Sequence, residues 1–123
     1  MGIIHHPQYL VWCEIGRTDY IREFGASYAE LERAGLLLAV AEVGVRYVAS
    51  ARYDELIMVE TMLERVQSRA LTFAYRIYRD EPAPRTLLAT ATTKLVATTR
   101  AGATRLLPAD LLEKFRNAVV SNV

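Results

Sequence analysis

Several residue types are scarce in this chain, and each shortage argues against a class of protein. A single cysteine, Cys13, excludes an intrachain disulfide framework and fits a reducing compartment. The 6 glycines and 4 prolines are few beside an apolar fraction of 52%, which excludes a disordered chain and is typical of a globular one. The net charge of +1 argues against a polyanion-binding surface, so we expect no nucleic-acid partner.

Long apolar runs are missing as well. No run approaches the ~18 consecutive apolar residues that a membrane-spanning helix needs. The N-terminus lacks the basic segment and apolar run of a secretory signal peptide. With the lone cysteine, these absences predict a cytoplasmic protein without a membrane span. The length of 123 residues predicts one domain, 1–123, with a core of its own.

The first part of the chain is predicted to be helical. Within residues 8–24, Tyr9 and Cys13 belong to a set of residues that recurs at steps of three and four. Further apolar residues occupy most of the other sides, which is typical of a buried helix. A second, short helix is predicted at 28–33, and Gly35 is expected to end it.

The rest of the chain shows the period of two that is typical of strands. Strands are expected at 37–47, 56–66, 71–78 and 87–99, a loop at 80–84, and a last helix at 109–119. In the first strand, one face is predicted to carry Ala39, Ala41, Val43, Val45 and Tyr47. Short turns favour antiparallel neighbours, and one long sheet can curl around the first helix, so we predict an α+β fold.

The residues at the start of the first helix form a pattern of chemical interest. Gly2 is followed by the pair His5 and His6, which comes directly before Pro7. Proline favours the first turn of a helix, where its missing N–H is not needed. His5 and His6 are therefore expected at the mouth of the helix, where unpaired backbone N–H groups point outward and the helix dipole is positive. Such a mouth can stabilise a carbonyl oxygen that gains negative charge.

With this pattern in place, the chain resembles a hotdog-fold acyl-CoA thioesterase of the 4-hydroxybenzoyl-CoA thioesterase type. Its sharpest part reads Gly-x-x-x-His-Pro-x-Tyr-Leu, from Gly2 to Leu10. The other matching residues are Glu14, Arg17, Arg46, Tyr47, 51–54 and 71–73. The resemblance implies a long, curved antiparallel sheet wrapped around a central helix. It implies no metal or redox cofactor, with coenzyme A entering only as part of the substrate.

One catalytic group of the family does not appear in the chain. The family places its catalytic aspartate three residues before the glycine matched by Gly2, which lies before Met1, and most of its first strand would also precede Met1. The first strand is therefore expected to be truncated. One interpretation is an acyl-CoA thioesterase whose true start lies upstream, releasing a carboxylic acid and free CoA. Another is a catalytically impaired hotdog protein that binds acyl thioesters or serves in assembly. A third is a hotdog dehydratase that uses His6 with Glu14.

The resemblance assigns His6 and Glu14 to catalysis. The backbone N–H near His6 would polarise the thioester carbonyl. Glu14 is the one carboxylate in the middle of the first helix, roughly 12 Å from His6 at 1.5 Å per residue, and is a fallback general base. The alternative for Glu14 is an interaction with Arg17 or Thr18 at helical spacing.

Four further residues are candidates for holding the substrate. Gly2, His5 and Tyr9 are candidates for contacting the substrate, although for Tyr9 core or dimer packing is the favoured interpretation, and both can hold at a subunit boundary. Arg69 lies in the predicted turn after the second strand and is the candidate for the CoA phosphates. Cys13 is interpreted as a small apolar filler and not as a nucleophile, and no metal site is predicted.

The resemblance also implies assembly. Hotdog proteins pair into dimers and often into dimers of dimers, with the active site between two subunits. The strand at 37–47 is the candidate for the dimer edge. The identity of the acyl group is not encoded in a readable motif.

Overall fold

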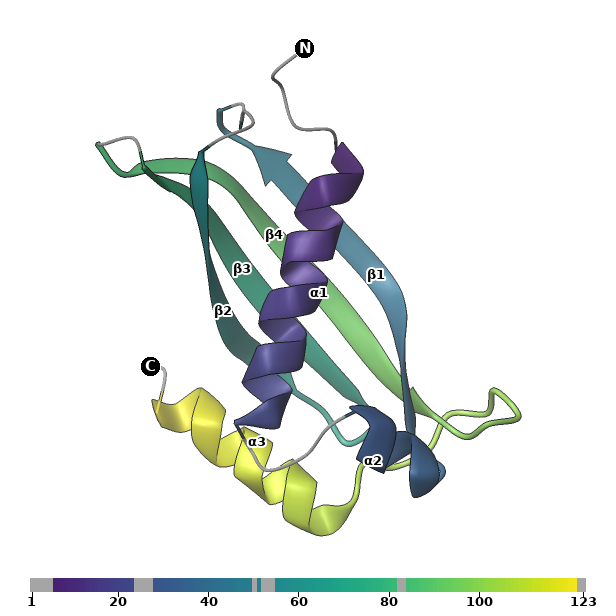
Figure 1. The fold of residues 1–123 in the computed structure, drawn as a ribbon. Coiled ribbons are helices and arrows are strands. Elements are labelled where there is room, and N and C mark those ends of the chain that lie inside the picture. The colour runs from purple at the N-terminus through teal and green to yellow at the C-terminus, as the bar shows by residue number, and fades with distance from the viewer. Residues whose placement is uncertain (1–5, 24–27, 50, 52–54, 82–83, 122–123) are drawn as a thin grey trace.

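The computed structural model describes residues 6–23, 28–49, 51, 55–81 and 84–121. Figure 1 shows one long helix lying across a face of a curved sheet. The elements in chain order are α1 (His6–Arg22), α2 (Tyr28–Arg33), β1 (Leu37–Tyr47), β2 (Leu56–Val66), β3 (Ala70–Glu81), β4 (Thr86–Thr98) and α3 (Ala109–Ser121).

The strands of the described residues form a four-stranded sheet in the order β1-β4-β3-β2, and all neighbours are antiparallel. One tight turn joins β2 to β3. The first strand, β1, pairs with the last strand, β4, and therefore lies at the opposite edge of the sheet from β2. The predicted α+β arrangement of long antiparallel strands around a helix is confirmed. The position of 37–47 at a sheet edge is confirmed too.

The predicted element boundaries hold closely, with one clear error. The loop predicted at 80–84 begins later in the structure, because β3 continues through Asp80 to Glu81. Glu81 is opposite Leu56 and Arg79 is opposite Ile57. Asp80 therefore has no partner residue in β2 and forms a β-bulge in β3. Pairing with the start of β2 therefore outweighs the local preference of acidic residues for turns.

The predicted facing of β1 is correct only in its second half. The register shifts between Val40 and Glu42, so the strict alternation is broken there. Val40 is opposite the buried Leu95, and Val43 is opposite the buried Thr93. Residues opposite one another share a face, so Val40 faces the same way as Val43. Ala39 therefore faces the other way, contrary to the prediction.

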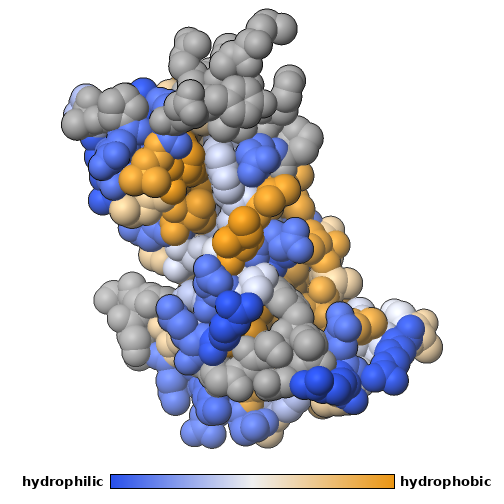
Figure 2. All heavy atoms as spheres, in the orientation of Figure 1, coloured by the Kyte–Doolittle hydropathy of each residue, from blue (hydrophilic) through white to orange (hydrophobic). Residues whose placement is uncertain are grey.

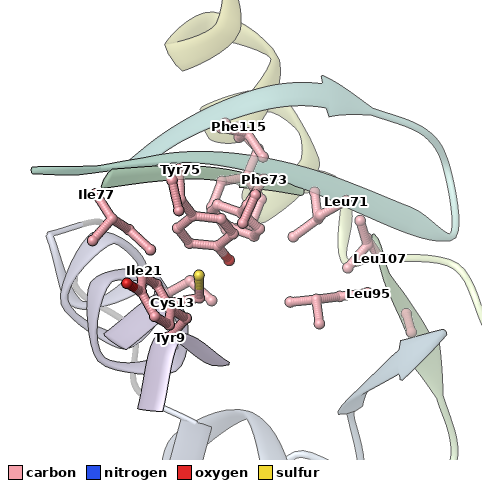
Figure 3. Close-up of a cluster of buried hydrophobic side chains, with 14 of the residues drawn as sticks. Tyr9, Cys13, Ile21, Leu71, Phe73, Tyr75, Ile77, Leu95, Leu107 and Phe115 are labelled. Carbon is pink, nitrogen blue, oxygen red and sulfur yellow. The ribbon is translucent and has the colours of Figure 1, made fainter. Parts of the chain in front are cut away.

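The core lies between α1 and the sheet. One stripe of α1 is buried, with Tyr9, Cys13 and Ile21 exposed by 2% or less, and it faces inward-pointing residues of the sheet such as Phe73 and Ile77 (Figure 3). Side chains four residues apart share one face of a helix, which explains this spacing.

The opposite side of α1 is open, so the expectation of a helix buried on most sides is wrong for the single chain. Val11 is 43% exposed and Ile15 is 54% exposed. On the same face of the sheet, Val40 and Val43 of β1 are each 48% exposed. Figure 2 shows apolar atoms gathered over the middle of α1 and over β1 beside it. Within one chain, the sheet covers one stripe of the helix and leaves the other to solvent.

Candidate active site

The mouth of α1 is the centre of the candidate site. The helix begins at His6, and Pro7 is its second residue, so the predicted position of His6 at the helix mouth is confirmed for its backbone. The first N–H groups of a helix have no acceptor within that helix. Gly2 and His5 lie outside the described residues. The roles of all three toward a substrate stay predictions.

Tyr9 anchors this end of α1 to the sheet. Its hydroxyl accepts a hydrogen bond of 3.1 Å from the backbone N–H of Ala51. Its ring meets Trp12 and Tyr47 edge to face, with centroid distances of 5.1 and 5.0 Å. With only 2% of Tyr9 exposed, the structure places the residue in the core of this chain. A contact between Tyr9 and substrate stays a prediction.

Glu14 lies on the open side of α1, next to the exposed Ile15. Thr18 Oγ1 donates a hydrogen bond of 2.8 Å to the backbone oxygen of Glu14, so this expected interaction involves the main chain and not the carboxylate. The carboxylate is thus presented away from the core stripe of α1. Its proposed role as a base requires a substrate that reaches this open side.

Arg69 lies far from the helix mouth in the same chain. The turn that carries it is held in place, since Ala97 N–H donates to Arg69 O at 2.8 Å and Leu107 N–H donates to Ser68 O at 2.9 Å. Tyr9 meets Ala51 just before β2, and the 11 residues of β2 then run away from it, about 35 Å at ~3.3 Å per residue. Figure 1 shows the start of α1 and the β2–β3 turn at opposite ends of the sheet. One chain therefore does not bring Arg69 to His6.

Arg17 is a residue whose environment sequence reasoning missed. The sequence offers Arg17 as a residue of the family resemblance and as a partner for Glu14, but in the structure it is 8% exposed and points into the core. Its Nη1 donates to the Tyr75 hydroxyl at 3.4 Å, and that hydroxyl lies 2.7 Å from Thr93 Oγ1. The spacing of Arg17, eight residues after Tyr9 on the buried stripe, was the available signal.

Burial changes the acidity of two groups in this core. It raises the pKa of Cys13 to about 11, and the positive charge of Arg17 only partly opposes the shift. Burial also raises the pKa of Tyr75, against the opposing effects of its hydrogen bonds with Thr93 and Arg17. A thiol with a raised pKa is a poor nucleophile. The interpretation of Cys13 as an apolar filler fits this environment.

A groove of about 670 Å³ crosses all four strands without touching α1. Its floor includes Met62, Ala74, Thr92 and Gly44, which are cross-strand neighbours, and Val119 of α3 borders it. Ala74 alternates with the inward-facing Phe73 and Tyr75, so this row points away from α1. None of the predicted site residues in the described ranges lines the groove, so it is distinct from the helix mouth.

Two further properties concern ions and membranes. Among the residues that the structure describes, no three His, Cys, Asp or Glu side chains are grouped so that they could hold a metal ion. No helix within the described ranges has the length and apolar character to cross a membrane.

The chain belongs to the thioesterase superfamily. The model of that family matches residues 1–85, which include the Gly-to-Leu motif, α1, α2 and the first three strands. The sheet wrapped around α1 is the hotdog fold. The resemblance inferred from the motif is therefore confirmed at the level of the family and of the fold.

Named relatives extend this result. The chain is 36% identical over 78 residues to the putative acyl-CoA thioesterase YneP of Bacillus subtilis, an alignment that covers 63% of this chain and 56% of YneP. It is 31% identical over 80 residues to the acyl-CoA thioesterase YbgC of Haemophilus influenzae, covering 64% and 59%. The alignments thus span little more than half the length of these relatives.

Among solved structures, the hypothetical protein TT1821 from Thermus thermophilus superposes with a TM-score of 0.86 at 31% identity. The match covers 96% of this chain and 88% of that one. Nearly the whole chain therefore shares one fold with this neighbour.

Proposed function

We propose that the protein is an acyl-CoA thioesterase, which hydrolyses an acyl-CoA thioester to a carboxylic acid and free CoA. The relatives named as acyl-CoA thioesterases support this substrate class. The observation that carries the proposal is the start of α1 at His6, with a proline in its first turn. The helix mouth presents N–H groups, without partners in the helix, to the oxygen that becomes negative when water attacks the thioester.

The proposed reaction has three requirements: the carbonyl must be polarised, a base must activate water, and the CoA part of the substrate must be bound. The backbone at His6 supplies the first, and losing one such donor costs on the order of 3 kcal/mol of barrier in other enzymes. Gly2, His5 and Tyr9 border the acyl group in this proposal. Glu14 is the candidate base, and because it lies roughly 12 Å along α1 from His6, it would act on a carbonyl held at the helix mouth of a second subunit. The sulfur leaves as the thiol of CoA, so neither a metal nor a redox cofactor is required. A reducing cytoplasm suits both this product and the lone cysteine.

We further propose that the site forms between two copies of the chain. Arg69 and His6 lie at opposite ends of the sheet, so a grip on CoA phosphates near the helix mouth requires the arginine of a second subunit. The edge strand β1 and the open side of α1 offer the surface for pairing, since both carry exposed apolar residues. Two such dimers would then pair into a tetramer.

The test is the release of CoA from a panel of aliphatic and aromatic acyl-CoA substrates. We expect saturable hydrolysis by the unmodified chain. Glu14→Gln keeps the size of the side chain, and a loss of kcat of about 100-fold or more would place the base on α1. Glu113→Gln, on the exposed surface of α3, is the matched control and should leave kcat unchanged. Binding of a non-hydrolysable acyl-CoA analogue without any hydrolysis would instead identify an acyl-thioester-binding protein.

A further inference from the structure

A chain of polar groups crosses the apolar core between α1 and the sheet. Arg17 donates to Tyr75, and the hydroxyls of Tyr75 and Thr93 share a hydrogen bond. Tyr75 is 1% exposed and Thr93 is 3% exposed. We call Arg17, Tyr75 and Thr93 the polar seam. A charged group in such a core is tolerated only where polar partners receive it, so the seam constrains where Arg17 can lie.

The polar seam differs from the surrounding contacts in being directional. Apolar packing depends on buried area and tolerates small displacements, whereas a hydrogen bond restricts both distance and angle. A slip of α1 by one residue would move it about 1.5 Å along its axis and turn it by roughly 100°. Such a slip would remove Arg17 from Tyr75. The seam therefore selects one axial and rotational position of α1.

Gly16, the neighbour of Arg17, adds a close contact with β2. A Cβ atom at this position would overlap Thr61 Oγ1 and approach Val59 Cγ1 to 3.2 Å. Thr61 is opposite Tyr75 in the ladder, so this close contact and the polar seam lie at the same level of the sheet. The close contact of Gly16 with β2 and the hydrogen bond of Arg17 to Tyr75 therefore fix α1 at this level of the sheet.

We propose that Arg17, Tyr75 and Thr93 are positioning residues, which set the location of the helix mouth in the active site by fixing α1 on the sheet. This inference rests on the proposed function. Arg17 lies eleven positions after His6, about 16 Å along the helix, and a helix transmits a displacement along its axis as a rigid rod. A misplacement of about 1 Å at a reacting centre can reduce the rate about 100-fold.

The variants Tyr75→Phe and Thr93→Val each remove one hydroxyl of the polar seam and keep the side-chain size. We expect kcat to fall about tenfold or more in Tyr75→Phe, with KM changed less than about twofold, because binding groups remain in place. Arg17→Lys keeps a donor and should retain more activity than Arg17→Met. Ile77→Val is the matched control, since Ile77 is the next inward-facing residue of β3 and is fully buried.

A second measurement separates this inference from the proposed function. Hydrogen exchange of the α1 backbone amides should accelerate in Tyr75→Phe but not in Ile77→Val, when both are compared at equal distance below their Tm. Faster exchange in Tyr75→Phe would support the positioning role of the polar seam even if no acyl-CoA were hydrolysed. The absence of hydrolysis would contradict only the proposed function. Equal losses of kcat in Tyr75→Phe and Ile77→Val, or unchanged exchange in α1, would overturn the positioning role.

Discussion

Cys13 shows how strongly one residue depends on its neighbours. It lies on the buried stripe of α1, one turn after Tyr9 and one turn before Arg17, and it is 1% exposed. Its thiol is therefore sealed from solvent and kept protonated. The chemistry of the side chain is decided by its burial, since a cysteine on an exposed surface would have an ordinary acidity.

The raised pKa of Cys13 predicts a loss of stability at high pH. The unfolded thiol titrates near its ordinary value of 9.0 and the folded one near 11, so between these values the unfolded state loses its proton first. Rising pH then favours unfolding, by about 1 kcal/mol between pH 9 and 10, whereas below pH 8 the contribution is constant. The test is the free energy of unfolding in urea, measured against pH for the unmodified chain and for Cys13→Ala. Both proteins contain Tyr75, so subtracting the two pH profiles cancels its titration and leaves the contribution of Cys13.

The same burial predicts that Ellman's reagent modifies Cys13 only after unfolding. At pH 8 we expect negligible reaction with the folded chain and full reaction in denaturant. A folded chain that reacts as fast as a free thiol would contradict the sealed environment.

Arg69 offers a prediction about substrate recognition. If it binds CoA phosphates, Arg69→Gln should raise KM for acyl-CoA about tenfold and leave kcat nearly unchanged, because a charged hydrogen bond is worth roughly 1.5–3 kcal/mol. The same variant should hydrolyse an acyl-pantetheine as well as the unmodified chain does, since that substrate lacks the nucleotide. Arg22→Gln, whose ion pair with Asp19 is largely exposed, is the control. Equal losses on both substrates would contradict a phosphate contact.

At the scale of elements, the end of α2 is determined by a single glycine. Gly35 has a φ of 83°, Gly35 N–H donates to Glu32 O at 2.9 Å, and Leu36 N–H donates to Leu31 O at 2.9 Å. This pair of bonds is the Schellman motif, which closes a helix and turns the chain. The turn directs Leu36, 1% exposed, into the core just before β1 begins.

The Gly35 turn predicts a graded response to substitution. A Cβ at Gly35 would meet no atom within 4 Å, so the cost of Gly35→Ala is that of the left-handed backbone alone, about 1 kcal/mol. Gly35→Asn should cost less, because asparagine tolerates this conformation better. Urea midpoints of the three proteins test the order. An Asn variant less stable than the Ala variant would contradict this explanation.

At the scale of the whole molecule, the chain leaves an apolar surface uncovered. The open side of α1 and the edge strand β1 contribute Val11, Ile15, Val40, Val43 and Tyr47, all exposed by more than 40%. Monomeric proteins rarely leave large apolar patches in water, and an open strand edge invites pairing. The surface therefore supports the proposed pairing with a second copy of the chain.

This surface predicts dimer-breaking substitutions. Ile15→Lys and Val43→Lys place a charge on the proposed interface and should shift the protein from dimer to monomer in sedimentation experiments, with hydrolysis lost in parallel. Leu106→Lys, at a site that is 54% exposed in the loop before α3, is the matched control and should remain dimeric. A monomeric unmodified chain, or dissociation in Leu106→Lys as well, would contradict the proposed pairing.

The predicted and observed structures differ where contacts far apart in the sequence decide. The bounds of α2, β1 and β2 follow from local signals, namely the glycine that ends a helix and the period of two. The register shift near Glu42 and the extension of β3 to Glu81 depend on the partner strands, which no local pattern reveals. For the site, the motif predicted His6 at the start of a helix, but the partners of Arg17 in the core could be identified only once the sheet beneath α1 was known.

The order of the residues alone determined the type of each element, the family and the mouth of α1, because backbone propensities, helix ends and a contiguous motif are local properties. Tertiary structure alone decided which side of α1 is buried, how Arg17 reaches Tyr75 and Thr93, and that Arg69 lies a sheet length away from His6. Those facts depend on the curvature and register of strands distant in the sequence, where burial and hydrogen bonding are settled jointly by many residues.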